Sequence, residues 1–420
     1  MRVLYLVPLG MLCAMPSWAF LSDMDVHPMP TAPPSLPAAG SIANDPTFGT
    51  TILRVTDSGD SASYCINDYS NQPPLNINNT KIRAICQVGY KRLKVWDFDA
   101  ASMTRSNGRI QANPPPGLRE YEAQWSRTSP KKFYAVALKA LYEITIPDGS
   151  STTWTNTLIR DFGMDFVGNY ITQMSVSDND DVFAFHYVNH NGVSTGYMAY
   201  KRSTDTILLN VSDEGSINEV EIDKSGRYLV SLKANTTKDL HVWDLHGTPT
   251  RTTVESLWWF SHRAMGNGIA GTSCNTRRLC MRPLAAPNSA TFLLPKDSWS
   301  YANQQDHFAM PGGDDSWMVG TRFHLNGGSV VNAFDNEIVF IATDGSNRVR
   351  RIAHHWSIVI DNNYDAQPRA SVSRDGNFVA FTSNWGKADA RTDVYVARIQ
   401  SGTTIDRTPP QSPRNLTIAH

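Results

Sequence analysis

Histidine side chains in the second half of the chain are the residues most suited to chemistry. His262, His307 and the adjacent pair His354-His355 each lie beside a segment with the composition of a β-strand. Neutral imidazoles from neighbouring elements can ligate a divalent transition metal such as manganese or zinc, with Asp306 or Gln305 as an oxygen ligand. The alternative is that each histidine hydrogen-bonds its own loop or a neighbouring carboxylate. The sequence leaves both hypotheses open.

Several other chemistries have no motif in the chain. There is no Gly-x-x-x-x-Gly-Lys phosphate loop and no His-Glu-x-x-His pair, so nucleotide-driven and thermolysin-like reactions lack their usual signature. The acidic run Asp178-Asn179-Asp180-Asp181 lacks the glycine and the distal glutamate of a calcium-binding EF-hand loop. This run therefore predicts a turn between two strands.

The elements that would position these residues are clearest between Pro368 and Ile399. Runs at 369–373 and 378–383 carry β-branched or aromatic residues at alternate positions, and the turn former Arg374-Asp375-Gly376-Asn377 joins them. A third run at 392–399 completes the unit. The pattern predicts three antiparallel strands with a tight hairpin.

Similar strand and turn patterns recur upstream. They begin at Leu75, Ala123, Gln173, Glu219, Ala264 and Asp306. Successive units start about 45 to 60 residues apart, which is the spacing of propeller blades rather than of helical repeats. We therefore predict an all-β fold, a seven-bladed β-propeller of four-stranded antiparallel blades over residues 48–400, with six or eight blades as alternatives.

A propeller brings distant residues together at its central channel. The connection from the outer strand of one blade to the inner strand of the next lies on one face, beside the channel. Polar residues in these connections should converge there, and three of the connections, before the fifth, sixth and seventh blades, contribute histidines. The predicted substrate-binding residues at this position are Arg263, Glu219, Gln173 and His354.

The N-terminal residues have the features of a secretion signal. Residues 1–19 combine an early positive charge, an apolar run and the small-x-small cleavage site Ser17-Trp18-Ala19, with an uncleaved membrane anchor as the alternative. We expect a secreted or periplasmic protein without a membrane span after cleavage. Residues 20–47 are rich in proline, methionine, alanine and serine, which predicts an extended or disordered leader.

Two further segments flank the blades. The isolated strand predicted at 51–56 should complete the last blade and close the ring. Residues 401–420 are similar to the linker and first strand of a fibronectin type III module, so we expect either a C-terminal linker or the start of a truncated module there.

The cysteines favour disulfides. Cleavage of the signal removes Cys13 and leaves an even number in an oxidising compartment. We predict the pairs Cys274–Cys280 and Cys65–Cys86, and there is no Cys-x-x-Cys spacing of a zinc or redox site.

Some blade sequences resemble known propeller repeats. Val95-Trp96-Asp97 and Val242-Trp243-Asp244 resemble the ending of WD40 blades, although the accompanying Gly-His signature is absent. The Ser-x-Ser-x-Asp-Gly-x-x-Val-Ala-Phe pattern at 371–381 resembles the repeat of TolB-type propellers. These resemblances concern the fold and carry little information about activity.

A further resemblance concerns the last two blades. His307, the segment His354-His355-Trp356-Ser357 and residues 371–383 are similar to the histidine-bearing end of the oligogalacturonate lyases. Members of that family are seven-bladed propellers in which histidines hold a metal that binds the uronate, and a basic residue abstracts the proton α to the carboxylate.

The resemblance implies specific roles for residues of this chain. His262, His307 and His355 would be the metal ligands, and Arg369 or Arg322 would contact the acidic sugar. Together with Tyr364, these two arginines are the candidate catalytic residues. The chain has adjacent histidines where a His-x-His spacing is expected, and spacing alone identifies no arginine as the base.

The sequence supports two hypotheses for function. The first is recognition, and cleavage by β-elimination, of an acidic polysaccharide or oligosaccharide with one bound manganese or zinc ion. The alternative is a non-catalytic TolB-like module that binds a protein or glycan at the cell surface. The formal net charge of -1 gives no support to a nucleic-acid partner.

Overall fold

The computed structural model describes residues 20–399 with several internal gaps. The gaps are 167–169, 213, 215, 234–238, 255–262, 275–277, 300–303, 326–331, 361–362 and 389–390. The predicted signal, residues 1–19, and the predicted C-terminal tail, residues 401–420, lie outside the described residues.

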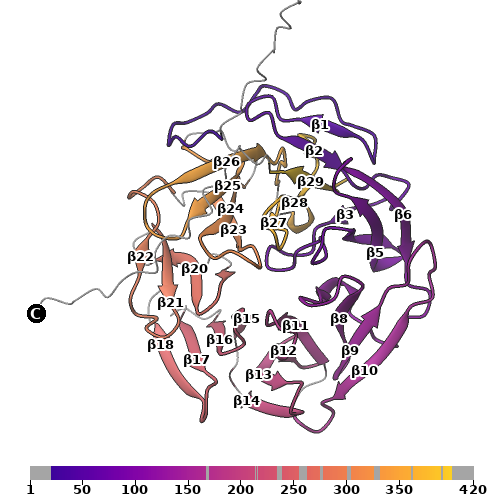
Figure 1. Cartoon of the computed structure of the whole chain (residues 1–420), viewed down its shortest axis with the longest axis vertical. Coiled ribbons are helices and arrows are strands. Elements are labelled where there is room, and N and C mark those ends of the chain that lie inside the picture. Colours follow the sequence, from indigo (N-terminus) through magenta and orange to yellow (C-terminus); the bar gives the residue numbers. More distant parts are fainter. Residues whose placement is uncertain are drawn as a thin grey trace, which may run out of the picture.

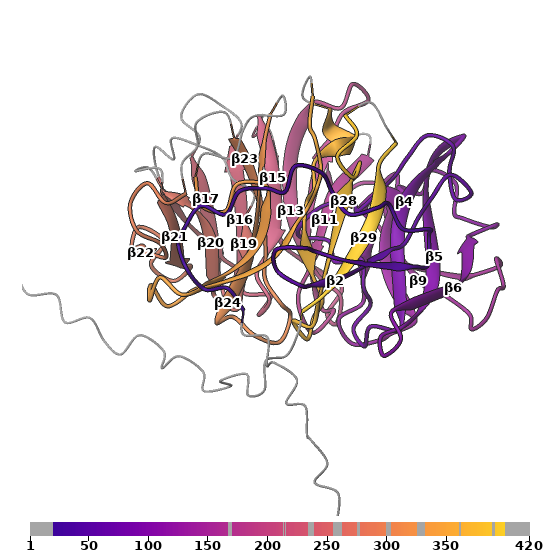
Figure 2. The same ribbon diagram turned by 90° about the horizontal axis from the view of Figure 1, so that it is seen from above.

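Seven antiparallel sheets are arranged as blades around a central channel (Figure 1). Six sheets have four strands, and the seventh has five in the order β1-β2-β29-β28-β27. Seen from the side, the blades stand next to one another in a broad ring (Figure 2). The prediction of an all-β, seven-bladed propeller is confirmed.

The strands follow the chain from the channel outward in each blade. Blades 1 and 2 comprise β3 (Cys65–Ile66), β4 (Lys81–Val88), β5 (Tyr90–Asp99), β6 (Thr104–Ile110), β7 (Gln124–Trp125), β8 (Lys132–Ala137), β9 (Ala140–Thr145) and β10 (Thr155–Asp161). Blades 3 and 4 comprise β11 (Tyr170–Val176), β12 (Val182–Val188), β13 (Ser194–Lys201), β14 (Thr206–Ser212), β15 (Ile217–Ile222), β16 (Tyr228–Lys233), β17 (Leu240–Asp244) and β18 (Thr250–Val254).

The remaining blades follow the same order. Blades 5 and 6 comprise β19 (Ala264–Met265), β20 (Ile269–Cys274), β21 (Arg278–Pro283), β22 (Thr291–Phe292), β23 (Gln304–Ala309), β24 (Trp317–His324), β25 (Glu337–Ala342) and β26 (Val349–His354). Blade 7 comprises β27 (Ser371–Val372), β28 (Phe378–Ser383), β29 (Asp393–Arg398), β2 (Thr51–Arg54) and β1 (Ile42–Asn44).

The ring is closed by a strand from the start of the propeller, as the sequence predicted. β2 pairs with β29, so Leu53 lies opposite Val396 although the two are far apart in sequence. Arg54 forms an ion pair with Asp393 of β29 at 2.7 Å. This pairing gives the last blade a complete set of strands and removes an open edge from the sheet.

Residues 20–47 were predicted to be an extended or disordered leader, and the structure gives this segment defined contacts. Ile42–Asn44 forms β1, which pairs with β2. Upstream, Asp23 forms an ion pair with Arg351 at 3.0 Å, and the Pro34 carbonyl accepts a hydrogen bond from the Trp385 indole. The segment therefore lies along the outside of blades 6 and 7, where it appears as the indigo ribbon beside β26 and β29 (Figure 1). Specific polar partners order it despite its lack of periodicity.

The turn between the first two strands of a blade is built from short polar side chains. In blade 3, Asp180 lies in the acidic run predicted as a turn and accepts hydrogen bonds from Ser126 and the Arg127 backbone of blade 2. In blade 7, Asp375 accepts bonds from Ser373 within its own turn and from Asn79 of blade 1. These turns therefore fix the hairpins and join adjacent blades.

Hydrophobic side chains fill the spaces between blades. Ile85 and Leu93 of blade 1 cluster with Trp125 and Phe133 of blade 2, and all four are almost fully buried. The Trp125 and Phe133 rings meet edge to face with their centroids 6.0 Å apart. The two described helices are short 3₁₀ turns, Glu120–Glu122 and Tyr364–Ala366, and no described helix is long and apolar enough to cross a membrane.

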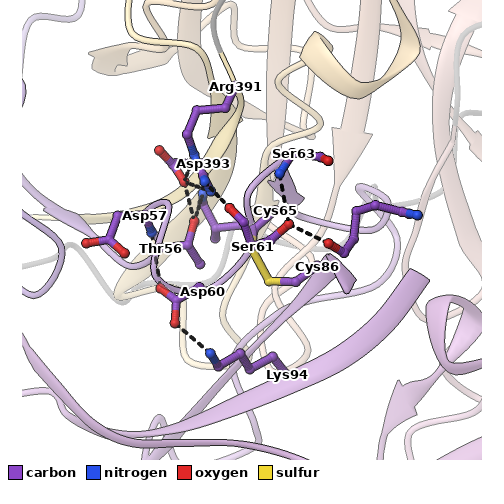
Figure 3. The surroundings of a disulfide bond; sticks show 12 residues. Thr56, Asp57, Asp60, Ser61, Ser63, Cys65, Cys86, Lys94, Arg391 and Asp393 are labelled. Atoms are coloured by element: carbon purple, nitrogen blue, oxygen red, sulfur yellow. Dashed lines mark hydrogen bonds and ion pairs between the residues drawn. A yellow bond between two sulfur atoms is a disulfide. The ribbon is translucent and has the colours of Figure 1, made fainter. Parts of the chain in front are cut away.

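Both predicted disulfides are present. Cys65–Cys86 joins β3 to β4 within blade 1, and Cys274–Cys280 joins β20 to β21 within blade 5. Figure 3 shows that Cys65 lies close to the closure of the ring, beside Asp393 and its partner Arg391. The Cys65 amide also donates a hydrogen bond to the Thr392 carbonyl at 3.0 Å.

The two disulfides should differ in their contribution to stability because they close loops of different length, with sequence separations of 21 and 6. We predict that Cys65→Ala/Cys86→Ala lowers the free energy of unfolding by about 3 kcal/mol and Cys274→Ala/Cys280→Ala by about 2 kcal/mol. Urea unfolding of the mature protein measures both, each pair serving as the control for the other. A larger loss for the Cys274–Cys280 pair would contradict the prediction.

Candidate functional site

A segment of blade 1 leaves the sheet and enters the channel. Ile66 lies opposite Ile85 of β4, and Leu75 lies opposite Ile82, so the eight residues 67–74 span a distance that two residues of β4 cover, and the chain between the two pairs loops out of the sheet. We call residues 67–74 the channel loop. The loop occurs where the other blades have a continuous inner strand or a tight turn, and its side chains contact distant blades.

The channel loop reaches three blades across the ring. Tyr69 packs edge to face on His307 of β23 with ring centroids 5.4 Å apart. The guanidinium of Arg369, which precedes β27, lies 5.9 Å from the centre of the Tyr69 ring. The Asn71 amide donates a hydrogen bond to Glu221 of β15. Blades 4, 6 and 7 are thus connected through one loop of blade 1.

Arg369 is a buried cation held between aromatic rings. Its guanidinium carbon lies 3.7 Å from the centre of the Tyr364 ring. Within the described residues, its nitrogens donate to the carbonyl oxygens of Asp68 and Tyr364, and no described carboxylate forms an ion pair with it. Its backbone has a φ of 44°, in the left-handed region, and its carbonyl accepts a hydrogen bond from Asn67 at 2.6 Å. The loop therefore constrains both ends of this arginine.

Tyrosines and charged groups surround the end of the channel where the connections between blades enter. We call Tyr64, Lys91, Tyr364 and Asp365 the upper mouth. Tyr364 is half exposed, Lys91 lies over the Tyr64 ring at 5.9 Å, and Lys91 is 3.9 Å from the Asp365 carboxylate. The upper mouth thus combines two tyrosine rings with one exposed cation.

Asp68 is the most perturbed acid beside the upper mouth. Burial raises the pKa of its carboxyl to about 7, and the nearby Glu122 carboxylate also raises it, while Arg83, at 3.6 Å, opposes the rise. A carboxyl group with such a pKa exchanges protons near neutral pH, which suits general acid and base chemistry.

Three predicted substrate-binding residues do lie along the channel wall. Arg263 forms ion pairs with Glu219 at 3.5 Å and with Glu221 at 3.3 Å. The Gln173 amide donates a hydrogen bond to the carbonyl of Asn218, on the next blade, at 2.7 Å. These contacts bring Gln173, Glu219 and Arg263 from neighbouring blades to one side of the channel. Their predicted contact with substrate stays a prediction.

The histidines do not form one group in the described part of the chain. His307 lies in the channel, stacked on Phe323 at 5.5 Å. The backbone N–H of His354 donates a hydrogen bond to the Asp45 carboxylate, and the His354 ring also contacts that carboxylate at 3.1 Å. His262 lies outside the described residues.

His355 already has a partner at each ring nitrogen. Its Nε2–H donates to the Arg322 carbonyl at 3.0 Å, and its Nδ1 accepts from the Ser357 amide at 2.9 Å. Burial lowers the pKa of His355 to about 3, so the ring is neutral at physiological pH. A metal could bind this ring only after one of the two hydrogen bonds broke.

The described residues therefore do not fit the metal centre that the resemblance implied. No group of three or more histidine, cysteine or carboxylate side chains in this part of the chain could hold a metal ion. The geometry favours the alternative hypothesis for His354 and His355, in which each ring bonds a neighbouring group. The role of His262 stays a prediction, and no step below is derived through a metal.

Arg322 lies inside blade 6 and not at the upper mouth. It lies in β24, almost fully buried, and forms an ion pair with Asp335 at 3.0 Å. Asp335 also pairs with His324 at 3.0 Å, and the Arg322 guanidinium lies 5.5 Å from the Trp299 ring. Of the candidate catalytic residues, Arg369 and Tyr364 are brought together, and Arg322 is held apart inside blade 6.

Sequence reasoning missed the channel loop and the groups around it. We expected the first blade to begin at Leu75, whereas its inner strand begins at Cys65. The available signal was the polar run at 67–74, which ends in two prolines and interrupts a strand. No sequence pattern marked Lys91 and Tyr64 as site residues, because the fold alone brings them beside Tyr364.

The fold of this chain is similar to those of several solved protein structures. An oligogalacturonate lyase from Vibrio parahaemolyticus aligns with a TM-score of 0.58 and 12% identity, over 87% of this chain and 100% of that chain. An oligogalacturonate lyase in complex with manganese aligns with a TM-score of 0.59 and 12% identity, over 88% of this chain and 98% of that chain. A chain of the mitotic checkpoint complex aligns with a TM-score of 0.50 and 11% identity, over 95% and 99% of the two chains.

These comparisons confirm the structural likeness to oligogalacturonate lyase propellers. No family model and no curated protein sequence matches the chain. At this level of identity, the likeness establishes the fold alone.

The raised pKa of Asp68 predicts a pH dependence of stability. Its pKa rises from 3.8 to about 7 on folding, so the folded state binds this proton more tightly. The contribution of Asp68 to stability therefore falls as the pH rises from about 4 to 7, by at most about 1.4 kcal/mol per pH unit, and is constant above pH 7. Asp68→Asn removes this dependence.

Urea unfolding of Asp68→Asn and the wild type between pH 4 and 8 checks this expectation. The stability of the variant relative to the wild type should increase up to about pH 7 and then level off. Asp365→Asn, at the same mouth, is the matched control because its carboxylate is paired with Lys91. A difference between Asp68→Asn and wild type that does not change with pH would contradict the assignment.

Proposed function

We propose that this protein binds an acidic saccharide at the upper mouth of its channel. The observation that carries the proposal is that two tyrosine rings at this mouth are each paired with a cation. Tyr364 covers Arg369 at 3.7 Å, and Lys91 lies over Tyr64 at 5.9 Å. Sugar rings stack on aromatic faces, and a uronate carboxylate pairs with a nearby cation.

Each group has a distinct part in such binding. The half-exposed Tyr364 ring offers a face for the apolar side of a sugar. The Lys91 side chain is 40% exposed and can contact the carboxylate directly, although it must give up its long contact with Asp365. Arg369 lies behind the Tyr364 ring and adds positive charge to the mouth without being exposed itself. The selected ligand is therefore acidic and carries a ring.

Export from the cytoplasm is the second part of the proposal. The two disulfides are compatible with an extracellular location, because such bonds persist in oxidising compartments. The sequence features of residues 1–19 supply the signal that would direct export. An acidic polysaccharide or a glycan on a cell surface is an accessible partner in that compartment.

Cleavage by β-elimination is a second candidate function, favoured by Asp68. The Asp68 carboxyl, with a pKa of about 7, is a suitable base for the proton α to the uronate carboxylate. The electron pair of the broken carbon–hydrogen bond forms a carbon–carbon double bond as the β carbon–oxygen bond breaks. The departing sugar oxygen takes the electron pair of that bond and receives the proton that Asp68 removed. Lys91 would stabilise the charge that develops on the uronate carboxylate, and Arg369 would add positive charge from behind the Tyr364 ring. Arg322 takes no part, because Asp335 holds it inside blade 6.

Binding is tested by isothermal titration with oligogalacturonates of three to five sugars and with the corresponding neutral galactose oligomers. We expect the acidic oligomers alone to bind. Tyr364→Ala should weaken the affinity about 10-fold, because it removes one aromatic stacking contact. Lys91→Gln should weaken it less, by an amount that shrinks at high salt.

Tyr90→Ala is the matched control for the binding experiment. Tyr90 is 58% exposed and follows the tip of the β4–β5 hairpin, and its ring is paired with Arg92 rather than Arg369. Its loss should leave the affinity unchanged. Equal binding of neutral and acidic oligomers, or equal effects of Tyr90→Ala and Tyr364→Ala, would overturn the proposed site.

Cleavage is tested separately by near-ultraviolet absorbance, which detects the unsaturated uronate product. If elimination occurs, Asp68→Asn should abolish product formation and retain binding of the oligomer. Absence of product with a broad panel of uronate polymers would eliminate the second candidate and leave the binding function intact.

A further inference from the structure

The channel also contains a cavity at the end opposite to the upper mouth. Its lining includes Asp178, Lys224, Gly312 and Arg374, which belong to the turns between the first two strands of blades 3, 4, 6 and 7. We call this end the lower mouth. Ser70 and Asn71 of the channel loop also line it, so the loop separates the cavity from the upper mouth.

Two arginine side chains beside this cavity differ in their partners, because one forms an ion pair with a carboxylate and the other does not. Arg374 forms an ion pair with Asp178 at 3.0 Å, across the channel between blades 7 and 3. The Arg127 guanidinium, from blade 2, donates to the neutral Gln124 amide oxygen at 3.2 Å, and within the described residues no carboxylate forms an ion pair with it. Burial lowers the pKa of Arg127; the Asp178 and Asp180 carboxylates oppose this effect, and the like charge of Arg374 adds to it. Burial also lowers the pKa of Arg83; Asp68 opposes this effect, and the like charge of Arg127 adds to it.

Hydrogen-bond donors around the cavity also lack partners in the described part of the chain. The hydroxyls of Ser70 and Ser371 are unbonded, and each residue is only 1% exposed. The Nε–H of Arg127 is unbonded as well. All three residues line the same cavity. Buried polar groups normally have partners, so such a set of donors indicates a ligand that accepts hydrogen bonds.

We propose that the lower cavity is a binding site for a small oxyanion, a carboxylate or a phosphate. The Arg127 guanidinium supplies the charge and a planar pair of donors, which match two oxygens of such an anion. The Ser70 and Ser371 hydroxyls donate from the channel loop and from β27. An anion at this position separates the like charges of Arg127 and Arg374 and satisfies the three donors together.

The position of Arg374 restricts the ligand to a small one. An added Cβ at Gly312 would lie 2.5 Å from the Arg374 side chain, so this arginine packs directly against the glycine backbone. Lys224 is also engaged, by the Asp315 carboxylate and the Pro311 carbonyl. With these two cations occupied by their own partners, Arg127 is the charge available to a ligand.

The experiment is isothermal titration of the mature protein with sodium phosphate and with sodium malonate, in chloride buffer of constant ionic strength. The two arms distinguish a phosphate site from a carboxylate site. We expect saturable binding of at least one anion, at least 10-fold weaker in Arg127→Gln and several-fold weaker in Ser371→Ala. Arg127→Lys keeps the charge but loses the planar donors, and should bind with intermediate affinity.

Two controls separate this site from the rest of the molecule. Arg227→Gln alters an exposed arginine paired with Asp244 and should bind both anions as the wild type does. Tyr364→Ala changes the upper mouth and should have no effect here, so failure of the proposed saccharide site leaves this test valid. Circular dichroism verifies folding, and Ser371→Ala and Arg127→Lys decide the outcome if Arg127→Gln does not fold. No binding by wild type, or equal binding by these variants, would overturn the inference.

Discussion

Charged side chains in the central channel of this propeller need partners, because burial of an unpaired charge costs far more than its contacts return. Arg263 illustrates how the chain meets this requirement. It lies between Glu219 and Glu221, and Glu221 also accepts a hydrogen bond from Asn71 of the channel loop. This network joins blades 5 and 4 to a loop of blade 1. Because the blades converge at the channel, compensation of these charges also fixes the blades relative to one another.

The channel loop gives the two ends of the channel different chemistry. Asp68 and Tyr69 contact the groups behind the upper mouth, whereas Ser70 and Asn71 line the lower cavity. The upper end therefore has aromatic rings with cations behind or beside them, and the lower end has unpaired donors and arginines. In the other blades, shorter segments connect the first two strands. The interruption of a single strand is thus the feature that creates two separate candidate sites.

The sequence predicted the features that depend on local pattern. Alternating residues and the turn at 374–377 identified the hairpins, and the isolated strand at 51–56 identified the closure. The four cysteines that follow the predicted signal favoured the two disulfides that the structure contains. The channel loop was not predicted, because its partners lie up to 315 residues away and it has no periodicity. His355 was misleading for a related reason. Its type suits a metal ligand, but the backbone groups that bond both of its nitrogens are visible only in the fold.

The disulfide Cys65–Cys86 lies at the base of the channel loop, so the redox conditions around the protein affect its candidate site. Cys65 is followed by Ile66, the last residue of β3, and the channel loop begins at the next residue, Asn67. The bond therefore anchors the loop at the base from which Asp68 and Tyr69 extend toward Arg369. The amide of Cys65 is also bonded to Thr392, next to the closing strand pair. Reduction would loosen the loop at the point where the ring is closed, so the geometry of both mouths depends on an oxidising environment.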